Sequence, residues 1–215
     1  MIAFGTGGWR AVIGEEFTRE NVERLSLAVA RRMKAEGADA PGIAIGYDRR
    51  FLSREAARWA AEVMAAEGVR VHFIAREAPT PLIMFTVKSM DLHYGMAVTA
   101  SHNPALYNGV KLFTRGGRAA ALAVTGPLGE AASIVAREEI RSVRYEDALA
   151  AGLIAEIAPE NGYLDAILRT LDMDAIRRRN LRIVLDPMYG VSRTSLMTIL
   201  LTARCDVDVI HERHD

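Results

Sequence analysis

The feature that most constrains this chain is residues 94–113, where an apolar segment breaks into a polar loop and the chain then becomes apolar again. Residues 94–99 are predicted as a strand, and three polar side chains follow it: Ser101, His102 and Asn103. Pro104 prevents the strand from continuing, and Lys111 lies within the second apolar segment. A hydroxyl, an imidazole, an amide and a cation are therefore expected together where a strand ends, which is where α/β sheets bind ligands.

Hydrophobic periodicity predicts alternating strands and helices around this loop. Strands are expected over residues 43–46, 69–74, 94–99 and 110–113, and helices over residues 18–37, 53–68, 80–90 and 127–139. Thr18, Ser53 and Thr80 are expected to cap the first three helices, because their hydroxyls can accept backbone N–H groups. This order of elements predicts an α/β fold, a three-layer α/β/α sandwich with a mostly parallel mixed sheet.

Two domains are expected, residues 1–158 and residues 159–215. Residues 141–158 are less regular and are interpreted as a connector. The start of a second, similar domain follows, with a helix from Tyr163, a strand over 181–185, a helix over 192–203 and a strand over 207–210. Because a parallel sheet is normally buried on both faces, apolar surface is expected to be exposed between residues 181 and 210 or paired with another molecule.

Composition excludes several classes of protein. Lysine plus arginine and aspartate plus glutamate number 27 each, so the formal net charge is zero and no nucleic-acid-binding surface is indicated. The single cysteine, Cys205, rules out an internal disulfide and fits a reducing compartment. The first residues lack a signal-peptide pattern, and no apolar run approaches the roughly 18 residues that a membrane span needs. A cytoplasmic protein with no membrane contact is therefore expected.

Three strings in the sequence point to one family. TASHNP spans residues 99–104, YNG follows at 107–109, and Lys111 lies ten residues after Ser101. This pattern resembles the phosphoserine loop of the α-D-phosphohexomutases, the family of phosphoglucomutase and phosphomannomutase. FGTGGWR at residues 4–10 and GYDRR at residues 46–50 are similar to two further segments of that family.

The resemblance implies a phosphohexomutase that interconverts hexose 1-phosphate and hexose 6-phosphate through a phosphoserine and a hexose 1,6-bisphosphate, which also serves as activator. The implied catalytic residues are Ser101, Lys111, Arg10 and His102. The implied substrate-binding residues are Asn103, Thr99 and Arg50. Lys111 would act in proton transfer if its site lowers its pKa.

The resemblance also implies a Mg²⁺ ion, bound through the Ser101 phosphate and through an aspartate-rich loop that this sequence lacks. Family members have four domains, and the likeness covers the first domain and the opening of the second. The chain is therefore interpreted as an N-terminal fragment that is inactive alone. Its expected partners are a hexose phosphate and either the missing C-terminal domains or a self-associating partner.

The residue types alone leave other interpretations open. Residues 4–10 also fit a flexible turn with a solvated arginine, the charged residues 48–50 also fit a cluster that only fixes a loop, and residues 101–103 also fit a polar turn. A serine hydrolase with His102 as base is disfavoured, because adjacent side chains point apart and no Gly-x-Ser-x-Gly elbow surrounds Ser101. A noncatalytic phosphosugar-binding or domain-interaction module is the alternative from another class.

Overall fold

The structure is a computed structural model that describes residues 2–5, 8–37 and 42–213. The chain divides into two compact units, Met1–Ile157 and Ala158–Asp215. The predicted boundary, after residue 158, lies one residue later than the observed one.

The first unit is built on a mixed sheet, which has seven strands within the described residues. The strands are β1 (Trp9–Val12), β2 (Gly42–Tyr47), β3 (Arg70–Ile74), β4 (Tyr94–Val98), β5 (Tyr107–Thr114), β6 (Arg118–Ala119) and β7 (Ile154–Ile157). Their order is β1-β5-β4-β2-β3-β7, with β6 paired to β5. Strands β4, β2, β3 and β7 run parallel, whereas β5 is antiparallel to β4 and to β1. The sheet therefore has a parallel part and an antiparallel part that meet at β4.

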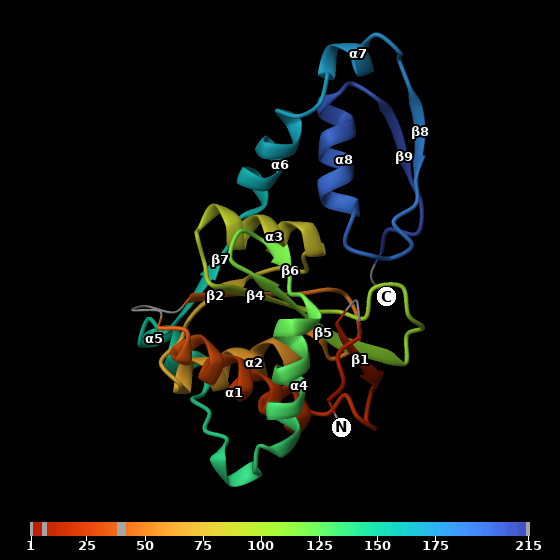
Figure 1. The fold of residues 1–215 in the computed structure, drawn as a ribbon. Coiled ribbons are helices and arrows are strands. Elements are labelled where there is room, and N and C mark those ends of the chain that lie inside the picture. The colour runs from red at the N-terminus through yellow and green to blue at the C-terminus, as the bar shows by residue number, and fades with distance from the viewer. Residues whose placement is uncertain (1, 6–7, 38–41, 214–215) are drawn as a thin grey trace. The chain divides into compact units, whose positions relative to one another are not determined.

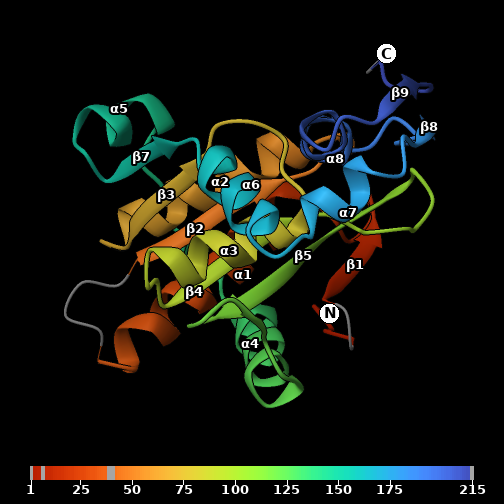
Figure 2. The ribbon, with the colours of Figure 1, turned by 90° about the horizontal axis from the view of Figure 1, so that it is seen from above.

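Helices cover both faces of this sheet, as the sequence predicts (Figure 1). Helices α1, α2 and α4 lie on one face and α3 lies on the other, and Figure 2 shows the same sheet from above. The bounds are α1 (Arg19–Ala35), α2 (Ser53–Ala66), α3 (Thr80–Ser89), α4 (Leu122–Ile134), α5 (Tyr145–Ala150) and a 3-10 turn at Arg137–Glu139. The α/β fold with three layers is confirmed.

Two of the predicted caps differ in the structure. Thr18 accepts a hydrogen bond from the Asn21 N–H and caps α1 as expected. Ser53, in contrast, is the first residue of α2, and the cap position belongs to Leu52, which has a φ of 62° and makes no side-chain cap bond. Thr80 is likewise the first residue of α3, after Pro79 at the cap position. Because the Ser53 hydroxyl does not cap the helix, it can donate a hydrogen bond to Asp48.

Helix α4 begins five residues earlier than predicted and ends five earlier. Pro127 was expected at its start but lies inside it, where the ring removes one backbone hydrogen bond. Thr125, Leu128 and Ala132 are buried on this helix, which packs against α1. Burial of this face offsets the missing bond.

The predicted connector is partly wrong. Residues 141–158 contain α5 and the strand β7, which pairs parallel to β3 at the edge of the sheet. Tyr145 of α5 is fully buried and packs edge-on against Phe73 of β3, with ring centroids 5.2 Å apart. Its hydroxyl bonds Glu156 of β7 at 3.0 Å. One buried tyrosine in a polar stretch thus ties the segment to the core.

Strand β1 was not predicted, and a glycine on its neighbour explains how it fits. Arg10 of β1 pairs with Gly109 of β5. A Cβ atom at Gly109 would lie 2.1 Å from the Trp9 carbonyl oxygen and 3.0 Å from the Arg10 Cα. The two backbones are too close for a side chain at position 109. A glycine there allows β1 to pair with β5, which places Arg10 in the sheet.

Gly109→Ala is expected to destabilise the first unit by about 2 kcal/mol or more, because the added methyl forces β1 away from β5. The matched control is Gly126→Ala in α4, where a Cβ meets nothing within 4 Å. That change is expected to be neutral or to stabilise by up to about 1 kcal/mol. Chemical denaturation measures both, and equal stability of Gly109→Ala and the unaltered chain would contradict the prediction.

The second unit holds α6 (Glu160–Leu168), α7 (Met173–Arg177), β8 (Arg182–Leu185), α8 (Arg193–Thr202) and β9 (Asp206–Val209). Strands β8 and β9 pair parallel around α8, so the predicted strand–helix–strand unit is present. Large apolar side chains are exposed between residues 181 and 210: Leu181, Val184, Met188, Tyr189, Leu196, Leu201 and Ile210. The expected exposed apolar surface is therefore observed in this unit.

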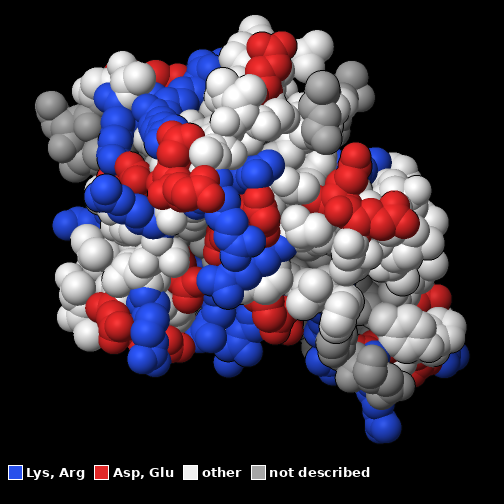
Figure 3. All heavy atoms as spheres, turned by 90° about the horizontal axis from the view of Figure 1, so that it is seen from below, with Lys and Arg blue, Asp and Glu red and all other residues white. Residues whose placement is uncertain are grey.

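Charges of both signs are mixed on the face shown in Figure 3, where lysine and arginine groups lie beside aspartate and glutamate groups. Ion pairs of the first unit include Arg31–Glu139 and Lys34–Glu67. Among the described helices, none has both the length and the apolar character needed to cross a membrane.

Candidate functional site

The serine loop connects the end of β4 to the start of β5, beside the end of β2. The Asp48 N–H bonds the Val98 carbonyl, which joins the two parallel strand ends. Ser101 is exposed, and its φ of 60° lies in the left-handed region. Residues other than glycine adopt that conformation uncommonly. The hydroxyl is thus presented at the carboxyl edge of the parallel strands.

Arg50 holds the loop by its backbone. Its guanidinium donates to the carbonyl oxygens of four loop residues at 2.5–2.9 Å: Ser101, Asn103, Pro104 and Tyr107. Its Nε lies 3.5 Å from the Asp48 carboxylate. The interpretation of residues 48–50 as a cluster that fixes a loop is therefore supported, and a substrate-binding role for Arg50 stays a prediction.

Asp48 is the centre of a largely buried polar cluster beneath the loop. Its carboxylate accepts hydrogen bonds from the Ser53 hydroxyl at 2.7 Å, from the Thr99 hydroxyl at 2.6 Å and from the Arg50 N–H at 3.0 Å. Thr99 also accepts a bond from the Ser101 N–H at 2.9 Å. The predicted substrate contact of Thr99 stays a prediction, because its recorded bonds serve the loop.

Arg10 reaches the loop from β1. Its Nη1 donates to the Asn103 side-chain oxygen at 2.8 Å, although the two residues are 93 positions apart. The Arg10 Nε is buried and has no hydrogen-bond partner among the described residues. A cation with spare donors therefore lies beside the loop. Residues 6 and 7 of the glycine-rich segment lie outside the described residues.

Lys111 of β5 lies close enough to Arg10 and Asp48 to interact with both charges. Burial lowers the pKa of Lys111 below its ordinary value of 10.5, the positive charge of Arg10 lowers it further, and Asp48 opposes the shift. Gly8 has a φ of +116°, and a Cβ there would lie 2.9 Å from the Lys111 Cγ and 2.6 Å from the Val110 carbonyl oxygen. The glycine lets the N-terminal segment pass directly over the lysine stem.

His102 and the expected metal have less support from the geometry. His102 is exposed next to Ser101. Among the described residues, no three His, Cys, Asp or Glu side chains are grouped so as to hold a metal ion. Asp48 already accepts three hydrogen bonds and faces Arg50. These residues therefore do not form a Mg²⁺ site by themselves.

Comparison with known proteins identifies the family. Residues 1–132 match the family model for the phosphoglucomutase/phosphomannomutase alpha/beta/alpha domain I. The chain belongs to the phosphoglucomutase/phosphomannomutase family. It is 34% identical to a phosphoglucomutase from Komagataeibacter xylinus over 203 residues, which is 89% of this chain and 36% of that protein. It is 27% identical to a phosphoglucomutase/phosphomannomutase from Thermococcus kodakarensis, covering 99% of this chain and 45% of the relative.

Solved structures agree with this family assignment. A structure from Thermus thermophilus, described as a phosphomannomutase, superposes with a TM-score of 0.81 and 29% identity, covering 97% of this chain and 45% of that one. The chain thus spans less than half the length of the curated relatives named here.

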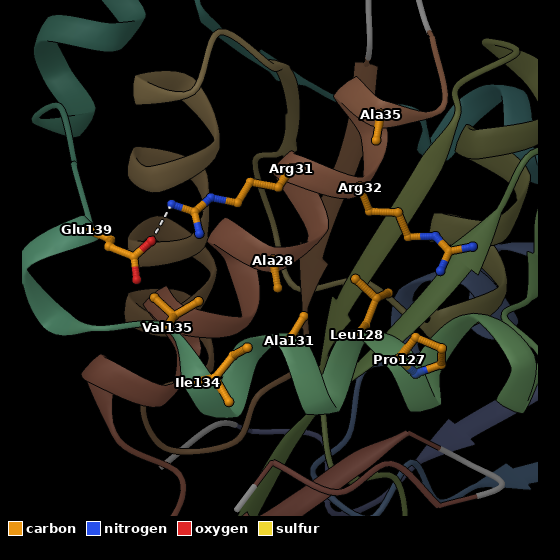
Figure 4. Close-up of a pocket in the computed structure, with 10 residues that line it drawn as sticks. All are labelled: Ala28, Arg31, Arg32, Ala35, Pro127, Leu128, Ala131, Ile134, Val135 and Glu139. Atoms are coloured by element: carbon orange, nitrogen blue, oxygen red, sulfur yellow. Dashed lines mark hydrogen bonds and ion pairs between the residues drawn. The ribbon is translucent and has the colours of Figure 1, made fainter.

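The first unit also has a pocket that is separate from the serine loop. A pocket of about 460 Å³ lies between α1 and α4 (Figure 4). Ala28, Leu128 and Val135 line it, and the Arg31–Glu139 ion pair crosses one side. None of the predicted site residues lines it, and its apolar walls are helix-packing surface.

Asp48, Ser53 and Asn108 contribute to the site without having been predicted as site residues. Asn108 is fully buried, and its Nδ2 donates to the Ser53 hydroxyl at 2.9 Å. Each was visible in the sequence only as part of a turn or cap. A carboxylate directly after a parallel strand is the one signal that would have identified Asp48.

The ammonium of Lys111 is expected to titrate below 10.5, because burial and Arg10 disfavour its charged form. Arg10→Ala should raise this pKa. Lys111 thus disfavours folding below its folded-state pKa, and that cost disappears as the pH rises to the unfolded value.

NMR titration of isotopically methylated lysines measures the pKa of Lys111 directly. The control is Arg115→Ala, which removes an equal charge from an arginine that is paired with Asp91. A Lys111 pKa at or above 10.5, or one unchanged by Arg10→Ala, would refute the prediction.

Proposed function

We propose that this chain supplies the phosphoserine site of a phosphohexomutase that interconverts hexose 1-phosphate and hexose 6-phosphate. The proposal rests on Ser101, which is exposed in a left-handed conformation after β4. Arg10 of β1 bonds Asn103 of the same loop, and Lys111 of β5 interacts electrostatically with Arg10. Membership of a mutase family supports the reaction class.

The proposed reaction is a phosphoryl transfer in two directions. The bond between phosphorus and the Ser101 oxygen breaks while a free hydroxyl of a hexose monophosphate forms the new bond. Lys111 in its neutral form takes the proton of that hydroxyl, which its lowered pKa favours, and the departing Ser101 oxygen receives this proton from the lysine. The resulting hexose 1,6-bisphosphate turns around and returns its other phosphoryl group to Ser101.

The surrounding side chains are proposed to neutralise the phosphate. A phosphoserine carries nearly two negative charges, so it requires cations and hydrogen-bond donors. Arg10 is the permanent cation, Lys111 becomes a cation once it has taken the hydroxyl proton, and His102 is an exposed donor next to the serine. The Asn103 oxygen is bound to Arg10, which leaves its Nδ2 as a donor. Mg²⁺, the bisphosphate activator and a cytoplasmic location stay predictions.

Phosphoryl labelling tests this function. The protein is incubated with glucose 1,6-bisphosphate, its intact mass is measured, and the phosphopeptide is mapped. One phosphoryl group on Ser101 is expected, together with conversion of glucose 1-phosphate to glucose 6-phosphate by the protein as the cell makes it. Phosphate on another serine, with Ser101 unmodified, would refute the proposed function.

A noncatalytic phosphosugar-binding or domain-interaction module is the second candidate. The lack of a metal-binding group among the described residues and the exposed apolar side chains of the second unit favour it for the 215 residues by themselves. Calorimetry distinguishes the two functions. Binding of glucose 1-phosphate without labelling or turnover would favour the binding module.

A further inference from the structure

We infer that Asp48 is a positioning residue for the reactive serine, because it links a relay of side chains beneath the loop to the backbone of Ser101. The relay consists of Asn108, Ser53, Asp48 and Thr99. Its catalytic consequence rests on the proposed function, whereas its effect on the loop conformation does not. The expected role is to fix where the Ser101 hydroxyl points.

The relay begins at a buried side chain whose amide nitrogen and oxygen both have hydrogen-bond partners within the protein. Asn108 is fully buried. Its Nδ2 donates to the Ser53 hydroxyl at 2.9 Å and to the Phe51 carbonyl at 3.0 Å, and its Oδ1 accepts from the Gly109 N–H at 2.8 Å. The orientation of this amide is thereby fixed, which in turn fixes the Ser53 hydroxyl.

Hydrogen-bond direction through the relay requires an acceptor at position 48. The Ser53 hydroxyl accepts a hydrogen bond from Asn108, so its O–H group donates to the Asp48 carboxylate. The Thr99 hydroxyl accepts a hydrogen bond from the Ser101 N–H, so its O–H group donates to the other oxygen of the Asp48 carboxylate. Both carboxylate oxygens therefore accept a hydrogen bond from a hydroxyl, whereas an amide of the same shape has only one oxygen that can accept.

Asp48 also connects the relay to the arginine that holds the loop. Its carboxylate accepts the Arg50 N–H at 3.0 Å and lies 3.5 Å from the Arg50 Nε. The same guanidinium donates to the Ser101 carbonyl. The peptide groups on both sides of the Ser101 Cα are thus held through Asp48, its N–H by Thr99 and its carbonyl by Arg50.

This double attachment explains the backbone conformation of Ser101. A φ of 60° is unfavourable for serine without such constraints. Release of the N–H should let the residue leave this conformation and move its hydroxyl. A displacement of about 1 Å can reduce a rate on the order of a hundredfold.

Two variants break the relay at different atoms. Asp48→Asn keeps the size of the side chain and removes one acceptor. Thr99→Val keeps the shape and removes the hydroxyl that bonds the Ser101 N–H. The matched controls are Thr99→Ser, which retains the hydroxyl, and Asp91→Asn, which makes the same change at an exposed ion pair with Arg115.

Amide hydrogen exchange on this chain is the primary measurement. Asp48→Asn and Thr99→Val are expected to raise exchange at the Ser101 N–H by roughly tenfold or more and to shift its ¹H–¹⁵N signal. Exchange in β2 and β3 should remain unchanged. Thr99→Ser and Asp91→Asn should behave like the unaltered protein. Unchanged exchange at Ser101, or equal increases throughout the sheet, would overturn the inference.

Steady-state kinetics on the protein as the cell makes it provide the second measurement. The two relay variants should lower kcat on the order of tenfold to a hundredfold with KM nearly unchanged, and Thr99→Ser should restore kcat. A rise in KM alone would overturn the positioning role. Absence of mutase activity in the unaltered protein, with the exchange pattern as expected, would refute the proposed function and leave the loop assignment standing.

Discussion

Replacing Ser101 by alanine should remove phosphoryl labelling and lower mutase turnover on the order of a thousandfold or more, because no other group takes over the role of a covalent carrier. Ser101→Gly is a sharper version of the same experiment. Glycine lacks the hydroxyl but adopts a φ of 60° without strain, so the loop should keep its conformation.

The controls for this prediction separate chemistry from folding. Ser142→Ala removes an exposed serine hydroxyl elsewhere on the first unit and should leave labelling and turnover unchanged. Ser101→Gly should match the unaltered chain in chemical denaturation to within about 1 kcal/mol. Appreciable turnover by Ser101→Gly would show that the reaction does not pass through this hydroxyl.

Replacing Arg50 by alanine is expected to destabilise the first unit by about 3 kcal/mol. The guanidinium side chain is only 15% exposed, and its removal leaves four loop carbonyls and Asp48 without their donor. Arg50→Lys should recover only part of this loss, because an ammonium group has three donors and no planar fork. Chemical denaturation measures the loss, and hydrogen exchange at residues 101–107 locates it.

A suitable control for Arg50→Ala is Arg115→Ala. Arg115 forms an ion pair with Asp91, and both side chains are more than 60% exposed. Its removal should leave the stability almost unchanged, since exposed ion pairs contribute little. If Arg50→Ala were as stable as Arg115→Ala, the bonds to the loop carbonyls would not hold the loop.

The sequence was informative about the elements whose signal is local. Strands β2, β3, β4 and β5 and helices α1, α2 and α3 carry their own periodicity or turn residues, and all were predicted. The serine loop was also predicted, because a polar string between two apolar segments needs no distant partner to be recognised.

Elements that depend on distant contacts were missed. Strand β7 is recognisable only once β3 offers it an edge, and β1 depends on the close approach allowed by Gly109. Likewise, Asp48 and Asn108 are 60 positions apart and meet only through Ser53. No local pattern shows that Ser53, at the start of a helix, will bond Asp48 and Asn108 instead of capping that helix.

Arg50 holds the serine loop entirely through main-chain oxygens. The shape of the loop is therefore largely uncoupled from the side chains at its tip. Ala105 and Leu106 are exposed there, so they can be exchanged for other residues while the backbone keeps its path. For protein engineering, these two positions form a library site beside Ser101 that can be varied without rebuilding the scaffold.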